Sequence, residues 1–426
     1  MIDLKALREE PDRIRAALLT RDADLGEVLD RIADLDTRRR EVLREVEALK
    51  AQRNTASEAV ARCKKAGTDA SEALRGLKDL SARIKELDAT LREVEDALRA
   101  EALSVPNVPL PEVPLGDASA NTVLRTWGTP PAFDFEPRPH WELAEHLGLF
   151  DLKRGARIAG SGFVVYTGMG ARLVRALITF MLDLHTADHG YTEIWPPALV
   201  NSASALGTGQ LPDLEGQMYA AGDDLYLVPT AEVPVTNLHR DELLAEADLP
   251  FGYVAYSPCF RREAGAHGRD TRGVQRVHQF DKVELVRFST PADSPREHER
   301  LVEHVEAVLQ RLELPYRILA LATGDLGFAS ARTLDFEVWA AGVSAWLEAS
   351  SASTFTGFQA RRAHIRYRPA GGGRPAFVHT LNASGVALPR TIIALLENNQ
   401  RADGTVRVPA ALVPYLGTDT LRPDGG

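Results

Sequence analysis

The chain has 426 residues, and its 50 Lys and Arg against 60 Asp and Glu give a formal net charge of -10 at pH 7. Hydrophobic residues make up 44% and charged residues 26%, which are ordinary globular values and exclude a wholly disordered chain. The acidic total argues against a uniformly basic nucleic-acid-binding protein, although a local basic patch is compatible with it.

Cysteines and long apolar runs are both scarce. Cys63 and Cys259 stand far apart and neither belongs to a C-x-x-C pair, so neither a disulfide framework nor a Cys-based zinc site is expected. The first ten residues carry charges where a signal peptide needs an apolar run, and no stretch approaches the ~18 apolar residues of a membrane helix. We therefore expect a cytoplasmic protein without a membrane partner.

The first hundred residues show the spacing of apolar residues that is typical of a coiled coil. Between two such stretches, Gly67 can end one helix and Ser71 can cap the next, and two long helices joined by a short turn must run antiparallel. An arm of roughly 36 residues would be about 54 Å long. Steps of three and four, interrupted once by Arg39, connect Val28, Ile32, Leu35, Val42, Val46 and Leu49, and then Leu80, Ile84, Leu87, Leu91, Val94 and Leu98.

The end of this expected arm is basic. Residues 53–85 contain eight Lys or Arg and four Asp or Glu, a local balance of +4. The segment is either an ordinary solvated helix surface or an arm that contacts a polyanion.

A proline-rich segment follows the helical part. Eight of the 25 prolines lie between residues 106 and 139, and such a segment suits neither a helix nor a central strand. We therefore predict a helical domain over 1–102, a linker over 103–139 and a second folded domain over 140–426.

The second domain mixes helices and strands. Residues 171–189 are predicted to form a helix closed by Gly190. The runs 252–260 and 274–288 flank a glycine-bearing loop at 264–273, which predicts an antiparallel hairpin. Helices do not alternate regularly with single strands, so the expected class is α+β on an antiparallel sheet flanked by helices, rather than a doubly wound parallel sheet. The strand-like runs are 163–166, 225–229, 252–260, 274–288, 333–339 and 376–381.

The usual glycine-rich nucleotide loops are absent from the sequence. No G-x-x-x-x-G-K-[ST] motif occurs, and the segment 168–173 lacks a third glycine, so it is interpreted as a plain helix entry. If the protein handles ATP, arginines must replace the backbone cradle. His185 and His189 lie four residues apart on the expected helix, but no third ligand is adjacent, so a structural role is favoured over a metal site.

Three polar clusters could carry chemistry instead. Alternating residues of one expected strand would share a face, which is either a solvent-exposed sheet face or the floor of a site. The segment 346–351 offers a carboxylate and hydroxyls that suit Mg²⁺ shared with substrate phosphates, and 380–385 leads from a strand end into a helix with Arg390 and Glu397. The residues of the strand face are Arg276, His278, Phe280, Lys282 and Glu284.

Together with the arm, these residues resemble bacterial-type seryl-tRNA synthetases, a family of class II aminoacyl-tRNA synthetases. The resemblance runs essentially end to end. Residues 190–197 are similar to motif 1 of the class, 260–284 to motif 2 and 385–397 to motif 3. Residues 228–232 are similar to the Thr-Ala-Glu element that lines the family's serine pocket.

The resemblance implies a serine–tRNA ligase that activates L-serine with ATP, releases pyrophosphate and transfers serine to the 3′ end of tRNA(Ser), with tRNA(Sec) as a further expected substrate. It implies Arg261 and Arg390 as catalytic residues, and Mg²⁺ held by Glu348 and Ser351. Motif 1 should form a homodimer interface, and the arm should lie across the long variable arm of the tRNA. The implied serine-binding residues are Thr230, Ala231, Glu232, Arg261, Glu284, Asn382 and Ser384. The implied ATP-binding residues are Arg261, Arg262, Glu263, Arg276, Val277, Phe280, Glu348, Ala349, Ser350, Ser351 and Arg390.

The sequence departs from the family pattern at two places. Ala352 and Thr354 stand where relatives carry Cys and Asn, and residues 388–389 read Leu-Pro where Val-Gly is common. These changes leave every polar residue assigned above in place. A paralogue that loads a carrier protein or small molecule is disfavoured because the long arm is present, and a non-catalytic RNA-binding relative is disfavoured because the expected catalytic arginines are retained.

Overall fold

The computed structural model describes residues 1–212, 216–263 and 272–423. The chain forms two units, Ile2–Pro106, and Asn107–Gly426 together with Met1. The first unit is helical and the second is built on a large sheet, which confirms the predicted α+β class with an N-terminal helical arm. In the described part of the chain, no helix combines the length and apolar character that a bilayer span requires.

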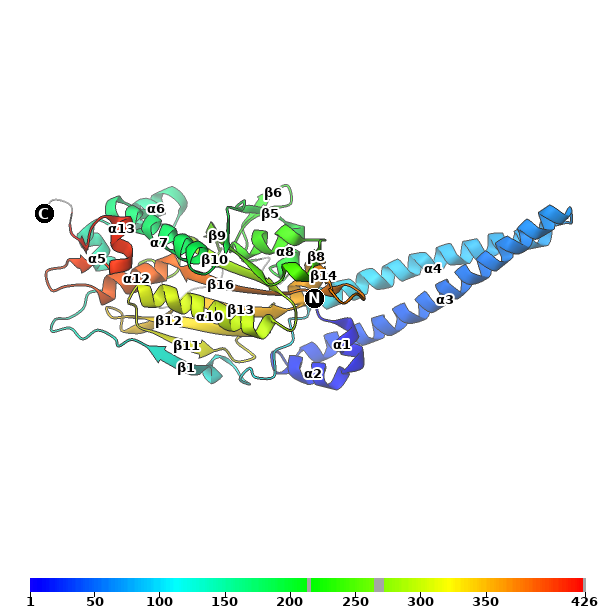
Figure 1. Cartoon of the computed structure of the whole chain (residues 1–426), viewed down its shortest axis with the longest axis horizontal. Helices are drawn as coiled ribbons and strands as arrows, with labels where there is room; N and C mark the ends of the chain where they lie inside the picture. The colour runs from blue at the N-terminus through cyan, green and yellow to red at the C-terminus, as the bar shows by residue number, and fades with distance from the viewer. Residues whose placement is uncertain (213–215, 264–271, 424–426) are drawn as a thin grey trace. The chain divides into compact units, whose positions relative to one another are not determined.

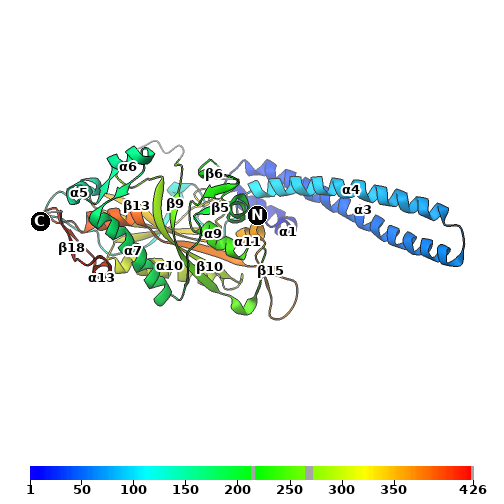
Figure 2. The same ribbon diagram turned by 90° about the horizontal axis from the view of Figure 1, so that it is seen from above.

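Two long antiparallel helices make up most of the first unit, and they lie side by side in Figure 1 and Figure 2. The predicted apolar stripes meet between them, where Ile32, Val46, Ile84 and Val94 are each at most 5% exposed. At 1.5 Å per residue, the longer helix of 42 residues measures about 63 Å. The predicted coiled-coil hairpin is therefore confirmed. The helices are α1 (Leu4–Glu9), α2 (Pro11–Leu19), α3 (Leu25–Ala66) and α4 (Ser71–Ser104).

The turn between α3 and α4 is capped differently from the prediction. Gly67 ends α3 in the left-handed conformation, with φ 69°, as expected. Ser71, however, is the first residue of α4, and its own amide N–H donates to the Asp69 carboxylate at 2.9 Å. The predicted cap at Ser71 is wrong, because the side chain of Asp69 reaches the first free backbone N–H instead.

The single interruption of the apolar stripe is compensated by charge. The Arg39 guanidinium lies 3.5 Å from Asp36 on the same helix and 3.6 Å from Glu95 on α4. Asp36 is only 4% exposed and also pairs with Arg8 at 3.1 Å. A charged residue in the seam is therefore tolerated because it has partners on both helices.

An eight-stranded sheet forms the centre of the second unit. Its neighbouring strands pair antiparallel except for one parallel pair, β4 with β9, at an edge. The predicted hairpin of 252–260 and 274–288 is confirmed as β9 paired with β10, and residues 264–271 of its loop lie outside the described residues. In spatial order the strands are β1 (Thr122–Trp127), β11 (Tyr316–Ala320), β12 (Arg332–Ala340), β13 (Ala345–Thr356), β16 (His379–Ala387), β10 (Gln279–Ser289), β9 (Phe251–Phe260) and β4 (Thr192–Ile194).

Helices bury one side of this sheet. In Figure 1, α10 lies along the strands, and one apolar cluster joins Leu177 of α7, Leu301 of α10 and Ile393 of α12 to Leu285 and Phe336 of the sheet. The predicted helix over 171–189 is confirmed as α7. The helices are α5 (His140–Leu147), α6 (Leu152–Ala159), α7 (Gly168–Ala187), α8 (Ser202–Thr208), α9 (Glu232–Thr236), α10 (Ser294–Arg311), α11 (Phe358–Ala363), α12 (Leu388–Asn398) and α13 (Val413–Leu416).

Smaller elements complete the second unit. The short strands are β2 (Phe150–Asp151), β3 (Val165–Tyr166), β5 (Leu199–Asn201), β6 (Ala220–Gly222), β7 (Leu225–Leu227), β8 (Leu243–Ala245), β14 (Arg366–Arg368), β15 (Ala376–Phe377), β17 (Val406–Arg407) and β18 (Thr420–Leu421). The 3-10 turns are η1 (Ala118–Ala120), η2 (Asn237–His239), η3 (Glu246–Asp248) and η4 (Ala410–Leu412).

Strand β10 is shorter than predicted at its beginning. It starts at Gln279, so Arg276 and His278 precede it and do not share its face. The reason is that the backbone N–H of His278 donates to Gly162 O at 2.9 Å rather than to a neighbouring strand. The expected shared face holds only for Phe280, Lys282 and Glu284.

Two β-bulges change which side chains point to the cavity side of the sheet and which point to the side covered by helices. The register of β13 against β12 shifts at Ala349, so Glu348 and Ser351 both line a cavity although they are three residues apart. The register of β16 against β10 shifts at Gly385, so Ser384 lines the same cavity while Val386 joins the apolar cluster. In strands without bulges, Glu348 and Ser351 would lie on opposite faces of the sheet, and Ser384 would lie on the same face as Val386.

A buried carboxylate connects several segments near the end of the sheet. Glu397 Oε1 accepts the backbone N–H of His140 and lies 2.8 Å from His140 Nδ1, while Oε2 accepts the N–H groups of Gly342 at 2.8 Å and Val343 at 3.1 Å. His140 Nε2 accepts from the Val274 N–H at 3.2 Å, so the imidazole proton must be on Nδ1. The network fixes the segment that precedes β10.

We expect Glu397→Ala to lower the free energy of unfolding by at least about 3 kcal/mol, because several buried donors would lose their acceptor. Urea unfolding followed by tryptophan fluorescence measures this change. Glu313→Ala is the matched control: its pair with Arg407 is 43% and 42% exposed, so the expected loss is under about 1 kcal/mol. Equal urea midpoints for the two variants would contradict the role of Glu397.

Candidate active site

The sheet carries a cavity of about 750 Å³ on the side where its polar residues emerge. A smaller hollow of about 80 Å³ adjoins it. A cavity of this size that is lined by both polar and apolar residues is typical of a site for a small-molecule substrate. Six residues line both spaces: Arg261, Glu263, Arg276, Lys282, Glu348 and Ser384.

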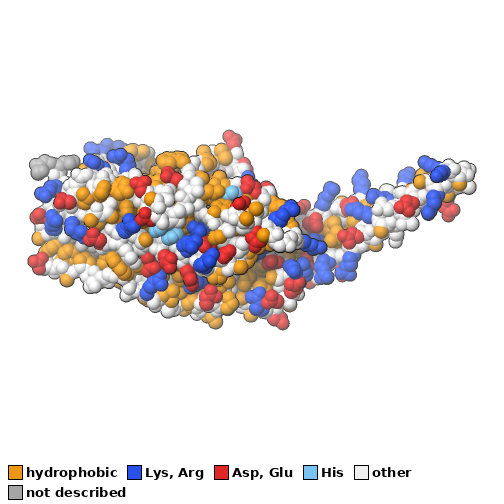
Figure 3. All heavy atoms as spheres, viewed as in Figure 1, with side chains coloured by type: hydrophobic (Ala, Val, Ile, Leu, Met, Phe, Trp, Pro, Cys, Tyr) orange, Lys and Arg blue, Asp and Glu red, His pale blue; other side chains and the backbone are white. Residues whose placement is uncertain are grey.

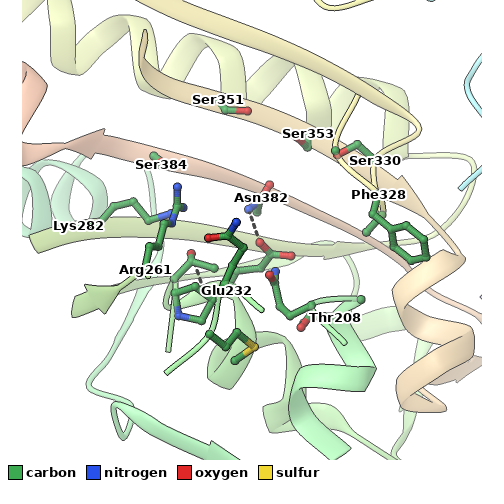
Figure 4. A pocket seen from close by; sticks show the side chains of 18 of the residues that line it. Thr208, Glu232, Arg261, Lys282, Phe328, Ser330, Ser351, Ser353, Asn382 and Ser384 are labelled. Carbon is green, nitrogen blue, oxygen red and sulfur yellow. Dashed lines mark hydrogen bonds between the residues drawn. The ribbon is translucent and has the colours of Figure 1, made fainter. Parts of the chain in front are cut away.

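One buried carboxylate, Glu232, lies with Asn382 at the floor of the larger cavity (Figure 4), and a second, Glu284, is buried behind the cavity lining. The Asn382 amide donates to both carboxylates, at 2.9 Å to Glu232 Oε2 and 2.9 Å to Glu284 Oε1. Gln359 donates to Glu232 at 2.5 Å, and Lys282 pairs with Glu284 at 2.6 Å. Burial, and then the neighbouring Glu284 carboxylate, raise the pKa of Glu232 to about 7.

Arg261 follows β9 directly and projects into the cavity (Figure 4). Its backbone N–H donates to His278 O at 2.9 Å, and its backbone O lies 3.0 Å from His278 Nδ1. Its guanidinium carbon lies 5.2 Å from the ring centroid of Phe280. The main chain of Arg261 is therefore held on both sides, while its charged end faces the cavity.

The smaller hollow gathers most of the expected nucleotide residues. Arg276 Nη1 lies 3.3 Å from Glu263 Oε2, and both residues line this hollow. Arg390, from the first turn of α12, donates to Glu348 O at 2.7 Å and lies 3.3 Å from Glu348 Oε2. The remaining expected residues on its lining are Val277, Phe280, Ala349 and Ser350.

An oxygen-rich corner lies next to this hollow. The bulge at Ala349 brings Glu348 and Ser351 to one side, and Asp335 stands opposite Ser351 on β12. Burial, and then the Glu348 carboxylate, raise the pKa of Asp335, and its Oδ1 has no hydrogen-bond partner among the described residues. Carboxylate and hydroxyl oxygens are the donors that Mg²⁺ prefers, so this corner fits the metal that the sequence implied.

Three expected site residues lie off the cavity surface. Ala231 and Glu284 are fully buried and absent from the lining of either hollow, with Glu284 reaching the site only through Asn382 and Lys282. Arg262 also lies off both linings, and its N–H donates to Gln217 O at 2.9 Å.

Several residues of the site escaped the sequence prediction. The sequence indicates Lys282 only as part of a polar strand face, whereas in the structure it is the cationic partner of Glu284. Gln359 comes from α11, far along the chain, and no motif indicates it. Asp335 could have been found from the sequence, because it is a charged residue at an alternate position of the apolar run 333–339.

The histidine pair at the end of α7 packs against other side chains, with His185 in the last turn of the helix and His189 just beyond it. His185 and His189 lie 2.9 Å apart through their Nδ1 atoms, and the His189 ring stacks on His304 at 4.0 Å. Within residues 1–212, 216–263 and 272–423, no cluster of three or more His, Cys, Asp or Glu could hold a metal ion.

Comparison with known sequences matches both units of the chain. Residues 218–399 match the family described as tRNA synthetase class II core domain (G, H, P, S and T), and residues 1–109 match the seryl-tRNA synthetase N-terminal domain. The chain is 53% identical to a serine–tRNA ligase of Gemmatimonas aurantiaca, over 99% of this chain and 100% of that protein. It is 51% identical to that of Geobacillus kaustophilus, over 99% of this chain and 100% of that protein.

Solved structures are similar over the whole chain. Seryl-tRNA synthetase from Pyrococcus horikoshii complexed with ATP has a TM-score of 0.93 at 36% identity, covering 99% of this chain and 100% of that chain. Cytoplasmic serine-tRNA ligase from Naegleria fowleri in complex with AMP has a TM-score of 0.88 at 28% identity, covering 100% and 99%.

The antiparallel sheet with its arginine-lined cavity defines a class II aminoacyl-tRNA synthetase, as the core-domain match shows. The chain belongs to the seryl-tRNA synthetase family, because its N-terminal unit and its full-length relatives both match that family. Its activity is that of an ATP-dependent serine–tRNA ligase, with serine and tRNA(Ser) as substrates.

Proposed function

We propose that Arg261 and Arg390 carry the activation step, in which the serine carboxylate attacks the α-phosphorus of ATP and pyrophosphate leaves. The observation that carries this assignment is that Arg261 lines both hollows, the larger together with Glu232 and the smaller together with most of the expected nucleotide residues. A guanidinium at this junction can neutralise charge that develops on the phosphate oxygens. The enzyme needs no nucleophile of its own, since catalysis rests on positioning.

The serine pocket in this proposal is the floor of the larger cavity. Glu232 and Glu284 supply negative charge for the serine ammonium group, and Asn382 keeps both carboxylates in place. Ser384, which lines both hollows, is placed to bond the serine hydroxyl. A pocket that pairs with a hydroxyl rejects alanine because its own polar groups would be left unpaired. Thr230 lines the same floor, and Ala231 supports it from behind.

The smaller hollow receives the nucleotide in this proposal. Phe280 offers a ring for the adenine, Glu263 an acceptor for its amino group, and Val277 a backbone contact. Arg276 and Arg390 bind the outer phosphates, for which each must leave its present carboxylate partner. Arg262, Ala349 and Ser350 complete the expected nucleotide wall.

Mg²⁺ would be held by Glu348 and Ser351, and when bound it neutralises phosphate charge and fixes the phosphate oxygens. Arg390 also donates to the backbone oxygen of Glu348, a hydrogen bond that leaves the Glu348 carboxylate available to the metal. Asp335 stands opposite Ser351 on the neighbouring strand β12, so a further carboxylate lies beside this proposed ligand.

We expect Arg261→Ala to reduce serine-dependent ATP–pyrophosphate exchange by roughly 10²–10³-fold, because one donor aimed at the developing charge is lost. Arg368→Ala is the control, since Arg368 is an exposed arginine on β14 that lines neither hollow. Exchange close to that of the unchanged enzyme in the Arg261 variant would remove Arg261 from the chemistry.

The pKa of Glu232 predicts a pH dependence for serine. Ionised Glu232 attracts the serine ammonium group, and the carboxylate takes up a proton as the pH falls through about 7. We therefore expect kcat/KM for serine in pyrophosphate exchange to fall below about pH 7 and to level off above it, and the KM for ATP to lack this inflection. Glu232→Gln should weaken serine use and abolish the inflection. A flat serine profile between about pH 6 and pH 8 would contradict the assignment.

The arm is the part of this proposal that recognises tRNA(Ser), through shape and backbone contacts at the variable arm. Its basic tip, eight Lys or Arg against four Asp or Glu over residues 53–85, supports this role. The proposed division is a tRNA-binding domain over 1–102, a linker over 103–139 and a catalytic domain over 140–426. The linker is not a free connection, because it contains β1 of the central sheet and residues from Asn107 onward belong to the second unit. Use of tRNA(Sec), transfer to the 3′-hydroxyl and a cytoplasmic location belong to the same proposal.

Replacing residues 30–98 by a short Gly-Ser linker should leave pyrophosphate exchange intact and abolish charging of tRNA(Ser), because the activation residues all lie in the second unit. The two assays are run on the same preparation, so exchange reports that the second unit is folded. Charging at the rate of the full chain would show that the arm does not recognise the tRNA.

A homodimer formed through motif 1 completes the proposal. Trp195 next to β4 is 74% exposed and is followed by two prolines, which is unusual for a tryptophan in a monomer. Light scattering should give a mass of twice the 46.6 kDa chain, and Trp195→Glu should shift it toward the monomer. A single-chain mass at micromolar concentration would contradict the dimer.

A further inference from the structure

Helix α6 turns nearly all of its side chains to solvent. Only Gly155 is buried, while Lys153, Arg154 and Arg157 are exposed, and we name these three residues the α6 patch. Figure 3 shows blue side chains gathered over this helix. A local excess of positive charge of this kind is notable in a chain whose net charge is -10.

Two of the three charges are available for a partner. Arg154 pairs with Asp151 at 3.0 Å, whereas the described residues provide no ion-pair partner for Lys153 or Arg157. Lys153 and Arg157 are four residues apart, so their side chains lie on the same side of the helix with about 5–6 Å between Cβ atoms. The patch therefore presents two adjacent free cations.

The patch is attached closely to the segment beneath it. A Cβ on Gly155 would lie 2.2 Å from Phe163 O, so the backbone of α6 rests directly on residues 163–164. Only glycine allows this approach, and it fixes where Lys153 and Arg157 stand.

The same segment is connected to Arg261. The Phe163 ring lies 5.3 Å from the His278 ring, and the His278 N–H donates to Gly162 O at 2.9 Å. His278 in turn exchanges backbone and side-chain hydrogen bonds with Arg261. A continuous set of contacts thus joins the α6 patch to the residue at the junction of the two hollows.

We propose that the α6 patch binds the phosphate backbone of the tRNA next to its 3′ end. The transfer step requires the 3′ end to reach the cavity at Arg261. The phosphates on the 5′ side of that end must then pass over the surface next to the cavity. Free cations one helical turn apart suit such a backbone, and their contacts carry no sequence information. The inference rests on the proposed placement of the reaction at Arg261 and adds a second RNA contact, separate from the arm.

The test is the double variant Lys153→Ala/Arg157→Ala in the full-length enzyme. We expect kcat/KM for tRNA(Ser) in aminoacylation to fall about tenfold at about 0.15 M salt, with its salt dependence weakened by about 1.4–1.8 logarithmic units per decade. Serine-dependent pyrophosphate exchange should stay unchanged, since neither residue lines a hollow. Unchanged exchange also shows that the proposed activation site is intact.

Arg366→Ala/Arg368→Ala is the matched control, because it removes two exposed arginines from β14. A second substrate, an RNA minihelix with only the acceptor stem and 3′ end, removes the arm's binding site, and the loss in the α6 variant should persist with it. Wild-type charging of both RNAs by the α6 variant, as expected if the patch binds an acidic protein or a lipid instead, would overturn the proposal. An equal loss in the β14 control would overturn it as well.

Discussion

Alternation of side chains along the central strands is the constraint on which the site depends. Each strand must send apolar residues toward the helices and polar residues toward the cavity, and a regular strand does this with a period of two. Some polar residues of the site do not follow that period. Bulges at Ala349 and Gly385 shift the alternation by one residue, so Glu348 joins Ser351 and Ser384 leaves the core side.

The floor of the larger cavity concentrates charge that the core could not accept by itself. Glu232 and Glu284 are at most 6% exposed, and two such carboxylates repel each other in a low dielectric. Lys282, Asn382 and Gln359 compensate for this with an ion pair and three amide hydrogen bonds. In the proposed serine pocket these contacts would hold the carboxylates in place, so little reorganisation is expected when a cationic group enters.

Both sides of the hairpin between β9 and β10 are anchored outside the sheet. On one side, Arg261 is held by His278, which is itself bonded to Gly162 beside α6. On the other side, Val274 is held by His140, and His140 by Glu397. Four residues outside the two strands, His278, Gly162, His140 and Glu397, therefore fix the two sides of this hairpin. Under the proposed function, this is how an arginine could take the place of a glycine-rich phosphate loop.

The sequence by itself determined the helical arm and the antiparallel hairpin, because apolar spacing and turn residues are local properties. Through the short motifs of the family it also indicated 14 of the 30 residues that line the two hollows. It could not determine that β10 begins at Gln279, that Asp69 caps α4, or that Lys282 and Gln359 support the carboxylates. Those features depend on which segment supplies the partner of a backbone N–H or a buried charge. That choice is made only when distant parts of the chain pack together, and the register shifts that place Glu348 beside Ser351 arise in the same way, from pairing between strands.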